Sequence, residues 1–206
     1  IGKIIISHNQ SKHKLFKSDE SSFLITGGYG SVGIEVCKWL SNNNVNTIII
    51  TGRRDSIPEE SLSQLQFENT NIIYKKCDAS NEIELDKIFT EIDNDDSIPQ
   101  LKGIIHAAGV LRDGLIENQT WDQFEQVLTP KIQGSINLHN LSIKHNYKLD
   151  SFILFSSITS LLGSLGQSNY SAANSFLDSL SHFRNNMNLP SLTINFGPWN
   201  VGMATD

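Results

Sequence analysis

The chain has 206 residues, the length of one large α/β domain, and 38% of them are hydrophobic, which is typical of a globular protein with a sizeable core. Its 16 Lys and Arg against 22 Asp and Glu give a formal net charge of -6, which argues against nucleic acid or an anionic membrane as a partner. No apolar run approaches the ~20 residues of a membrane-spanning helix and no signal-peptide pattern begins the sequence, so we expect a cytoplasmic protein.

The two cysteines indicate free thiols. Cys37 falls in a predicted helix and Cys77 at the end of a predicted strand, and the sequence contains no CxxC pair. Two isolated cysteines are most simply explained as reduced thiols of a cytosolic protein. We therefore expect neither a disulfide framework nor a metal site.

From residue 23 onward, short apolar runs alternate with segments whose apolar residues recur at helical spacing. The predicted strands span residues 23–26, 46–51, 72–76, 98–106, 151–156 and 192–196. The predicted helices span residues 31–41, 58–67, 81–92, 121–145 and 167–187. Repeated strand–helix units predict an α/β fold, namely a doubly wound (Rossmann), mostly parallel sheet in the order 3-2-1-4-5-6 with helices on both faces.

The two ends of the sequence do not fit this alternation. Residues 1–21 hold a short apolar run, Ile4-Ile5-Ile6, without a neighbouring partner, and then a polar and charged stretch. We interpret residues 1–21 as a linker or the end of a preceding structural subdomain, and residues 22–206 as the main domain. Few residues follow the last predicted strand, so we expect this domain to be truncated at its C-terminus.

A glycine-rich turn joins the first predicted strand to the first predicted helix. Its pattern Gly28-x-Gly30-x-x-Gly33 stands where a dinucleotide-binding fingerprint requires it. Glycines there permit a tight turn and let the backbone approach a pyrophosphate, whose charge the helix N-terminus attracts. The alternative is an ordinary glycine-rich turn, but the strand–turn–helix context favours the cofactor. The candidate cofactor-binding residues of this turn are Thr26, Gly27, Gly28, Gly30, Ser31, Val32 and Gly33.

Two arginines after the second strand bear on the form of the cofactor. Arg53 lies twenty positions after Gly33 and is followed by Arg54. An acidic residue near this offset would bind a free ribose 2′-hydroxyl, whereas arginine accommodates a 2′-phosphate. The pair therefore favours NADP, or its reduced form NADPH, over NAD. The alternative is a solvated arginine pair in a surface loop.

The ends of the third and fourth strands supply further candidates. Asp78, beside Ala79, either accepts a hydrogen bond from an adenine amino group or caps the helix that begins near Asn81. Small residues at the end of the fourth strand leave room for a nucleotide ribose or allow close packing of strand against helix, and both explanations can hold together. The residues of this stretch are His106, Ala107, Ala108 and Gly109.

Four more residues carry groups suited to carbonyl chemistry. Ser157 follows the fifth predicted strand at the carboxyl edge of the sheet, where ligands bind in this architecture. Tyr170 and Asn174 share one face of the last predicted helix, and Lys131 lies inside the long helix before it. Taken singly, each has an ordinary structural explanation: a hydroxyl cap, a core tyrosine, a helix amide and a lysine that reaches to solvent.

Taken together, these motifs resemble the short-chain dehydrogenase/reductase superfamily, and more narrowly the ketoreductase domains of modular polyketide synthases and animal-type fatty acid synthases. The resemblance covers roughly residues 2–203. Most of the superfamily carries Tyr-x-x-x-Lys; here Asn174 takes the last position and Lys131 appears upstream, as in ketoreductase domains of synthases. The matching motifs are Thr26-Gly27-Gly28-x-Gly30-x-x-Gly33, Gly52-Arg53-Arg54, His106-Ala107-Ala108-Gly109-Val110, Pro130-Lys131-x-x-Gly134, Phe155-Ser156-Ser157, Gly166-Gln167-x-x-Tyr170-x-Ala172-Ala173-Asn174 and Asn195-Phe196-Gly197-Pro198-Trp199.

The resemblance implies that residues 22–206 are an NADP-binding catalytic ketoreductase domain. Such a domain uses NADPH to reduce a β-ketoacyl thioester to a β-hydroxyacyl thioester during polyketide or fatty acid synthesis. The substrate is carried on the phosphopantetheine arm of an acyl carrier protein. The expected partners are that carrier protein and the other domains of the same multifunctional synthase.

The chemistry assigns a role to each of the four residues. Hydride that arrives at a ketone carbon leaves negative charge on the oxygen, so the site needs a proton donor and hydrogen-bond donors there. We expect Tyr170 to be the general acid, with the cation of Lys131 lowering the pKa of the phenol, and both residues to contact the cofactor at its nicotinamide end. Ser157 would hydrogen-bond the substrate oxygen, and Asn174 would orient Lys131 or a water that resupplies the proton.

The resemblance also bears on the configuration of the product. Leu111-Arg112-Asp113 matches the first and last positions of the Leu-Asp-Asp motif of ketoreductases that give the D-hydroxy product. Leu162 stands where the opposite class has tryptophan, and Asn169 also suits the D class, whereas Leu165 replaces the proline of that class. We expect a D-hydroxyacyl product.

Two other functions stay open at this point. One is a catalytically silent structural or docking domain of the synthase, which the presence of all four catalytic candidates disfavours. The other is a stand-alone short-chain reductase acting on a free ketone, or a sugar-nucleotide epimerase of the same superfamily. The positions of Lys131 and Asn174 disfavour this second alternative.

Overall fold

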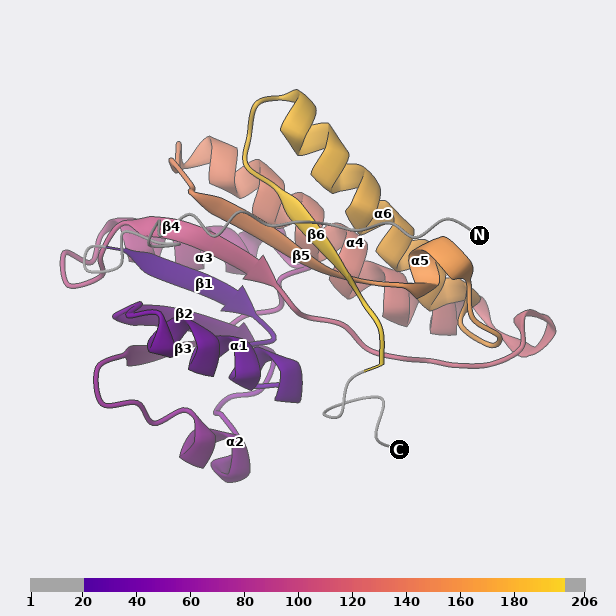
Figure 1. The fold of residues 1–206 in the computed structure, drawn as a ribbon, viewed down its shortest axis with the longest axis horizontal. Helices are drawn as coiled ribbons and strands as arrows, with labels where there is room; N and C mark the ends of the chain where they lie inside the picture. The colour runs from indigo at the N-terminus through magenta and orange to yellow at the C-terminus, as the bar shows by residue number, and fades with distance from the viewer. Residues whose placement is uncertain (1–20, 199–206) are drawn as a thin grey trace, which may run out of the picture.

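A single parallel sheet organises residues 21–198, the part of the chain that the computed structural model describes (Figure 1). Its six strands lie in the order β3-β2-β1-β4-β5-β6, which confirms the predicted doubly wound α/β fold. The strands are β1 (Ser22–Thr26), β2 (Thr47–Gly52), β3 (Asn71–Lys76), β4 (Leu101–His106), β5 (Ser151–Ser157) and β6 (Leu192–Phe196). The helices are α1 (Ser31–Asn42), α2 (Glu59–Gln64), α3 (Glu82–Asp93), α4 (Trp121–Lys144), α5 (Thr159–Leu162) and α6 (Ser168–Asn186), with a 3-10 turn at Ile116–Asn118.

Helices cover both faces of the sheet because its central strands carry apolar side chains on both sides. Every residue of β1 is buried. On one face, Phe23 and Ile25 belong to a core cluster that includes the apolar side of α1. On the other face, Leu24 belongs to a larger cluster with residues of α3, α4 and α6. The predicted helices on both faces are thereby confirmed.

The carboxyl ends of the strands meet along one edge of the sheet. Thr26 at the end of β1 pairs with Thr51 of β2 on one side and with His106 of β4 on the other. Ser157 at the end of β5 pairs with Phe196 of β6. The loops that follow these strands therefore converge at one edge, where ligands bind in doubly wound sheets.

Several boundaries differ from the prediction. Helix α2 is shorter than residues 58–67, because the chain leaves the helix to bury Leu65 and to pack Phe67 against the core under α1. Strand β4 begins at Leu101 rather than at residue 98, because Pro99 has no N–H to donate to a ladder and the N–H of Ile98 bonds back to the Asp95 carbonyl. Helix α5 and the 3-10 turn were not predicted, and the predicted run at residues 4–6 lies outside the described residues.

A polar side chain starts helix α3. The Asn81 side-chain oxygen accepts hydrogen bonds from the backbone N–H groups of Ile83 and Glu84, at 3.1 and 3.3 Å. Of the two roles considered for Asp78, helix capping is therefore taken by Asn81. The Asp78 carboxylate instead accepts hydrogen bonds from the N–H and the hydroxyl of Ser80, at 2.9 and 2.7 Å.

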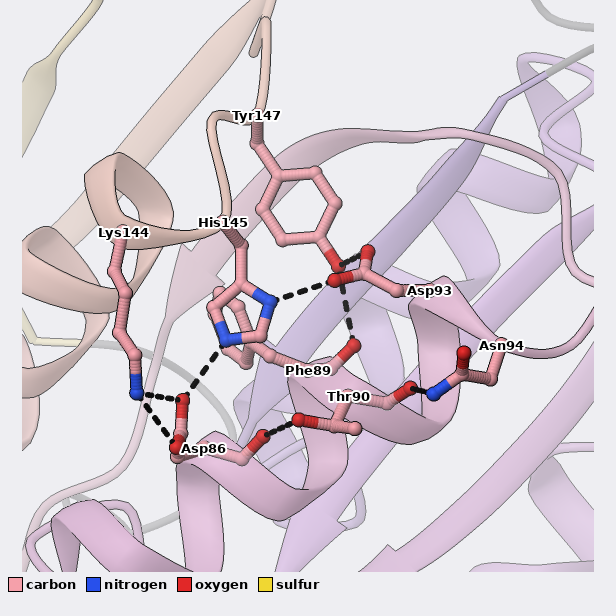
Figure 2. Close-up of polar contacts among 8 residues, drawn as sticks. All are labelled: Asp86, Phe89, Thr90, Asp93, Asn94, Lys144, His145 and Tyr147. Atoms are coloured by element: carbon pink, nitrogen blue, oxygen red, sulfur yellow. Dashed lines mark hydrogen bonds and ion pairs between the residues drawn. The ribbon is translucent and has the colours of Figure 1, made fainter.

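A polar cluster ties the end of α4 to α3 (Figure 2). His145 lies between two carboxylates of α3, with Nε2 2.8 Å from Asp86 Oδ1 and Nδ1 2.6 Å from Asp93 Oδ2. Lys144 also pairs with Asp86, and the Tyr147 hydroxyl donates to Asp93. Burial opposes protonation of the ring, but the hydrogen bonds and charges of the two carboxylates outweigh it and raise the pKa of His145.

Candidate functional site

Two adjoining cavities open at the carboxyl edge of the sheet. The first, of about 550 Å³, lies over the turn between β1 and α1 and reaches the ends of β2, β3 and β4. The second, of about 440 Å³, lies among the ends of β5 and β6, the start of α6 and the loop after β4. Val32, Ala107 and Gly109 line both cavities, so one extended ligand can occupy the two together.

The floor of the first cavity is a turn whose shape depends on glycine residues, which have no side chain. Gly27 has a φ of +71°, a left-handed conformation that L-residues rarely adopt. A Cβ atom at Gly33 would lie 2.4 Å from the Gly27 carbonyl oxygen, so only glycine lets α1 pack this closely on the turn. At Gly30, the nearest atom of the described residues to an added Cβ is 3.3 Å away. No other atom of the described residues, beyond the chain neighbours of Gly30, lies within 4 Å, so this side of the turn is less crowded than the side at Gly33, and it lines the first cavity.

The N-terminus of α1 faces the same cavity. Ser31 and Val32 of its first turn line the cavity, and among the described residues no side chain caps the helix at Gly30. Uncapped N–H groups and the helix dipole attract an anion. Arg53 lines the cavity from the end of β2 and adds a positive charge. These positive groups suit an anionic ligand such as a dinucleotide.

Most of the predicted cofactor-binding residues line the first cavity, but some do not. Those that do are Thr26, Gly27, Gly30, Ser31, Val32, Gly33, Arg53, Asp78, Ala79, Ala107, Ala108 and Gly109. Within residues 21–198, Gly28, Arg54 and His106 line neither cavity. Gly28 packs on β2, where an added Cβ would lie 2.4 Å from Ile50 Cγ2. The carbonyl of Arg54 accepts a hydrogen bond from the Tyr74 hydroxyl at 2.6 Å.

His106 is fully buried beneath the two cavities. Its Nδ1 lies 2.7 Å from Thr26 Oγ1, and its ring lies against Gly134 of α4, where an added Cβ would be 3.0 Å from Cε1. Burial, and then the charge of Lys131, lowers the pKa of His106 to about 3, so the ring is neutral. Its side chain therefore joins β1, β4 and α4.

The first cavity also includes residues that the sequence analysis did not predict as cofactor contacts. Tyr29 lines it from within the glycine turn, Thr51 and Cys77 from the ends of β2 and β3, and Pro130 from α4. The place of Tyr29 inside the glycine pattern is a signal that could have identified it. Thr51 and Cys77 carried no such signal, because their side chains can be placed only once the strand register is known.

Three of the four predicted catalytic side chains line the second cavity. Lys131 comes from α4, Ser157 from the end of β5 and Tyr170 from α6. Lys131 is buried, and its Nζ donates to the Phe155 carbonyl at 2.9 Å. The same nitrogen lies 5.3 Å from the centre of the Tyr170 ring. An amine, a hydroxyl and a phenol from segments far apart in the sequence are thus brought together.

Burial shifts the pKa values of the amine and the phenol in opposite directions, because it favours the neutral form of each group. It lowers the pKa of Lys131 to about 8, and the negative charge of Asp178 opposes this change. Burial raises the pKa of Tyr170, and a hydrogen bond from the Asn174 amide opposes the rise. The expected lowering of the Tyr170 pKa by a neighbouring cation is therefore not found, because burial dominates. The phenol keeps its proton at neutral pH, as a proton donor must.

The fourth residue, Asn174, is fully buried one helical turn beyond Tyr170. Its Nδ2 donates to the Tyr170 carbonyl at 2.8 Å. Its Oδ1 has no hydrogen-bond partner among residues 21–198. A buried acceptor without a partner fits a group that orients a water or an amine.

The predicted stereocontrol residues divide into two groups. Leu111, Asp113 and Leu162 line the second cavity. Asn169 does not: it is fully buried, its Nδ2 donates to the Arg112 carbonyl at 2.9 Å, and its Oδ1 accepts from the N–H of Tyr170 at 2.7 Å. Asn169 therefore joins the loop after β4 to the start of α6.

Membrane-spanning helices and clusters of potential metal ligands are both absent from residues 21–198. No helix of residues 21–198 has the length and apolar character to cross a membrane. The same residues hold no group of three or more His, Cys, Asp or Glu side chains that could bind a metal ion. Cys37 and Cys77 are free thiols, and burial raises the pKa of each to about 12.

The sequence of this chain is similar to segments of much longer synthases. Residues 21–201 match the family model described as KR domain. Lovastatin diketide synthase lovF of Aspergillus terreus is 31% identical over 205 residues, which cover 96% of this chain and 8% of that protein. Mellein synthase of Phaeosphaeria nodorum is 34% identical over 206 residues, which cover 93% of this chain and 11% of that protein. The chain thus spans about a tenth of the length of these curated relatives.

Solved structures of ketoreductases superpose on this fold. A ketoreductase domain from the bacillaene assembly line has a TM-score of 0.84 at 32% identity, over 91% of this chain and 46% of that one. A structure of A-type ketoreductases from a modular polyketide synthase has a TM-score of 0.83 at 30% identity, over 93% of this chain and 40% of that one. Because the family model matches most of the sequence, the chain belongs to the KR domain family, the ketoreductase domains of polyketide synthases.

Proposed function

We propose that this chain is an active reductase that uses NADPH to reduce a β-ketoacyl thioester to a β-hydroxyacyl thioester. The observation that carries the proposal is that Tyr170, Lys131 and Ser157 line one cavity, which adjoins the cavity over the glycine turn. The first cavity can then bind a dinucleotide, and the second cavity beside it can hold a carbonyl group next to a proton donor.

The first cavity supplies groups that would hold NADPH. The N–H groups at the start of α1 suit the pyrophosphate, Arg53 suits the 2′-phosphate and Asp78 suits the adenine amino group. Lys131 in the second cavity suits the nicotinamide ribose. When bound, the cofactor supplies a hydride to the substrate carbon.

Tyr170 donates the proton that the substrate oxygen requires. Its pKa is raised by burial, so the phenol keeps its proton until charge develops on that oxygen. The Ser157 hydroxyl donates a hydrogen bond to the same oxygen and stabilises the developing charge. Asn174 Oδ1 orients a water that returns a proton to the phenolate that remains.

Membership of the family supports a proposal for the substrate class and the partners. Lovastatin diketide synthase and mellein synthase are much longer than this chain. We propose by analogy that the substrate is held on the phosphopantetheine arm of an acyl carrier protein and that other domains of one synthase are the neighbours. Leu111 and Asp113 line the second cavity and support a D-hydroxy product.

Two measurements on the protein in its natural length test this proposal. Fluorescence titration is expected to give saturable NADPH binding. When a β-ketoacyl thioester of N-acetylcysteamine is added, we expect NADPH to be oxidised and the thioester to be reduced. Chiral analysis of the product is expected to show the D-hydroxy thioester. Binding without oxidation would contradict the reductase and support a silent docking domain. Faster reaction with simple ketones or nucleotide sugars would contradict the substrate class.

A further inference from the structure

Helix α6 carries a third polar side chain in line with two of the candidate catalytic residues. Tyr170, Asn174 and Asp178 follow one another at four-residue spacing, which puts them on one face of the helix. Tyr170 lines the second cavity, Asn174 is buried one turn further along, and Asp178 is half-buried one turn beyond that. The reaction proposed above does not use Asp178.

Two side chains from other elements hold the Asp178 carboxylate. The Ser160 hydroxyl of α5 donates to Oδ2 at 2.6 Å. The Asn195 Nδ2 of β6 lies 3.1 Å from Oδ1 and 3.0 Å from Oδ2. The carboxylate therefore connects α6 to both α5 and β6.

The Asn195 amide also reaches the end of β5. Its Nδ2 lies 3.2 Å from Ser156 Oγ and 3.3 Å from the Ser157 carbonyl oxygen. An amide has both a donor and an acceptor end, and the negative Asp178 oxygens favour the orientation that turns the donor toward β5 and α6. This end of β5 presents the Ser157 hydroxyl and, at Phe155, the carbonyl that binds the buried lysine.

We propose that Asp178 is a positioning residue of this site: its carboxylate orients Asn195 and Ser160, and through them holds the end of β5 against α6. Within the described residues Asp178 lines neither cavity, so it acts through these neighbours. The inference rests on the proposed function, because it assumes that reduction takes place in the second cavity.

The charge of Asp178 gives the proposal a second readout. Burial lowers the pKa of Lys131 to about 8, and Asp178 opposes that change. The other titratable groups around Lys131 are His106 of β4, neutral because burial lowers its pKa to about 3, and Tyr170 of α6, which burial keeps protonated. Asp113, after β4, lines the same cavity and raises the pKa of Tyr170. Without Asp178, Lys131 loses its proton at lower pH.

Four variants in the protein of natural length separate geometry from charge. Asp178→Asn and Asp178→Ser remove the charge, whereas Ser160→Ala removes the 2.6 Å hydrogen bond and leaves the charge. Glu125→Gln is the matched control, because it removes one negative charge from an exposed position of α4. Steady-state rates are measured across neutral and alkaline pH with NADPH and a β-ketoacyl N-acetylcysteamine thioester, and NADPH binding is measured by fluorescence.

We expect both Asp178 variants to lower kcat by roughly tenfold or more with KM and NADPH affinity unchanged. In the pH profile of kcat, the fall at alkaline pH should move to lower pH by about 0.5–1 unit in both Asp178 variants. Ser160→Ala should lower kcat but leave the position of this alkaline limb unchanged. If one Asp178 variant fails to fold, the other carries the measurement; if both fail, the kcat of Ser160→Ala decides. An unchanged kcat, or a limb that coincides in wild type, Asp178→Asn and Glu125→Gln, overturns the inference. Wild-type protein without turnover contradicts the proposed function instead.

Discussion

The two cavities differ in what their walls are made of. The first is built largely from backbone and small residues, such as Gly27, Gly30 and Ala107, around the uncapped start of a helix. The second has apolar walls with polar side chains among them, including the buried Lys131 and the half-buried Tyr170, whose protonation burial has shifted. Backbone groups do not titrate and tolerate no added atoms, whereas buried side chains depend on pH and on the alignment of separate elements. Binding and reaction can therefore be disturbed independently, and four experiments exploit this difference.

The largest effect is expected at the phenol of the second cavity. Tyr170→Phe removes the proton donor and should lower kcat by about 100- to 10,000-fold. NADPH affinity should stay the same, because the walls of the first cavity are untouched. Stopped-flow or steady-state rates with fluorescence titration measure both quantities. Tyr147→Phe is the control, because it alters a tyrosine that is hydrogen-bonded to Asp93 and that, in the described part of the chain, lines neither of the two cavities. Full turnover by Tyr170→Phe would remove this residue from the acid role.

A pair of glycine variants tests the first cavity. An added Cβ at Gly33 meets the Gly27 carbonyl oxygen at 2.4 Å, whereas at Gly30 the nearest contact is 3.3 Å. Gly33→Ala should therefore lower the free energy of unfolding by about 1–3 kcal/mol, as overpacking does. Gly30→Ala should cost less stability than Gly33→Ala, because the Gly27 carbonyl oxygen need yield only a few tenths of an ångström. It should weaken NADPH binding about tenfold or more, because the methyl group also meets the ligand. Urea unfolding and fluorescence titration distinguish the two. Equal stability of the two variants would contradict the packing argument.

Two arginine variants test where the 2′-phosphate binds. Arg53 lines the first cavity, whereas among the described residues Arg54 lines neither. Arg53→Gln should weaken NADPH binding about tenfold, because one hydrogen bond to a charged phosphate group is lost. It should leave NADH binding unchanged. Arg54→Gln should leave the ratio of the two affinities as in wild type. An equal loss in both variants would show that Arg54 also contacts the phosphate.

The smallest effect is expected away from both cavities, at the cluster of Figure 2. Asp86 and Asp93 raise the pKa of His145 above its unfolded value of about 6.5. The stability that this provides is fully present below that unfolded value and is lost as pH rises through the folded pKa. His145→Gln should therefore cost about 1 kcal/mol or less at acidic pH, and less still at alkaline pH, by urea unfolding. At each pH the NADPH affinity of His145→Gln should equal that of wild type, and a difference would link this cluster to the cavities.

The order of the sheet could be predicted because it depends on local patterns. Alternating strands and helices define the parallel sheet, and the glycine turn after β1 fixes where its strand order reverses. The residues of the glycine turn that line the first cavity follow from the same pattern. Gly28 shows its limit: the pattern suggests contact with a ligand, but an Ile50 side chain occupies the space where a Cβ would stand.

The network around the second cavity could not be predicted from sequence. Asp178, Ser160 and Asn195 lie on α6, α5 and β6, and their contacts depend on how these elements pack. The buried roles of His106 and Asn169 are of the same kind, because each side chain joins elements that local sequence cannot place together. The rise in the Tyr170 pKa also requires the folded structure, because it comes from burial.

Strand β6 is the last strand of the described chain to leave the ribosome. Gly197 and Pro198, directly after it, line the second cavity, whereas the turn below the first cavity lies near the start of the described residues. The two cavities nevertheless share one core, because Leu24 of β1 belongs to the same cluster as Leu177 of α6. Domains fold as units during synthesis. A nascent chain whose α6 and β6 are still in the exit tunnel therefore completes neither cavity, and a pause in translation at that stage would leave both unformed.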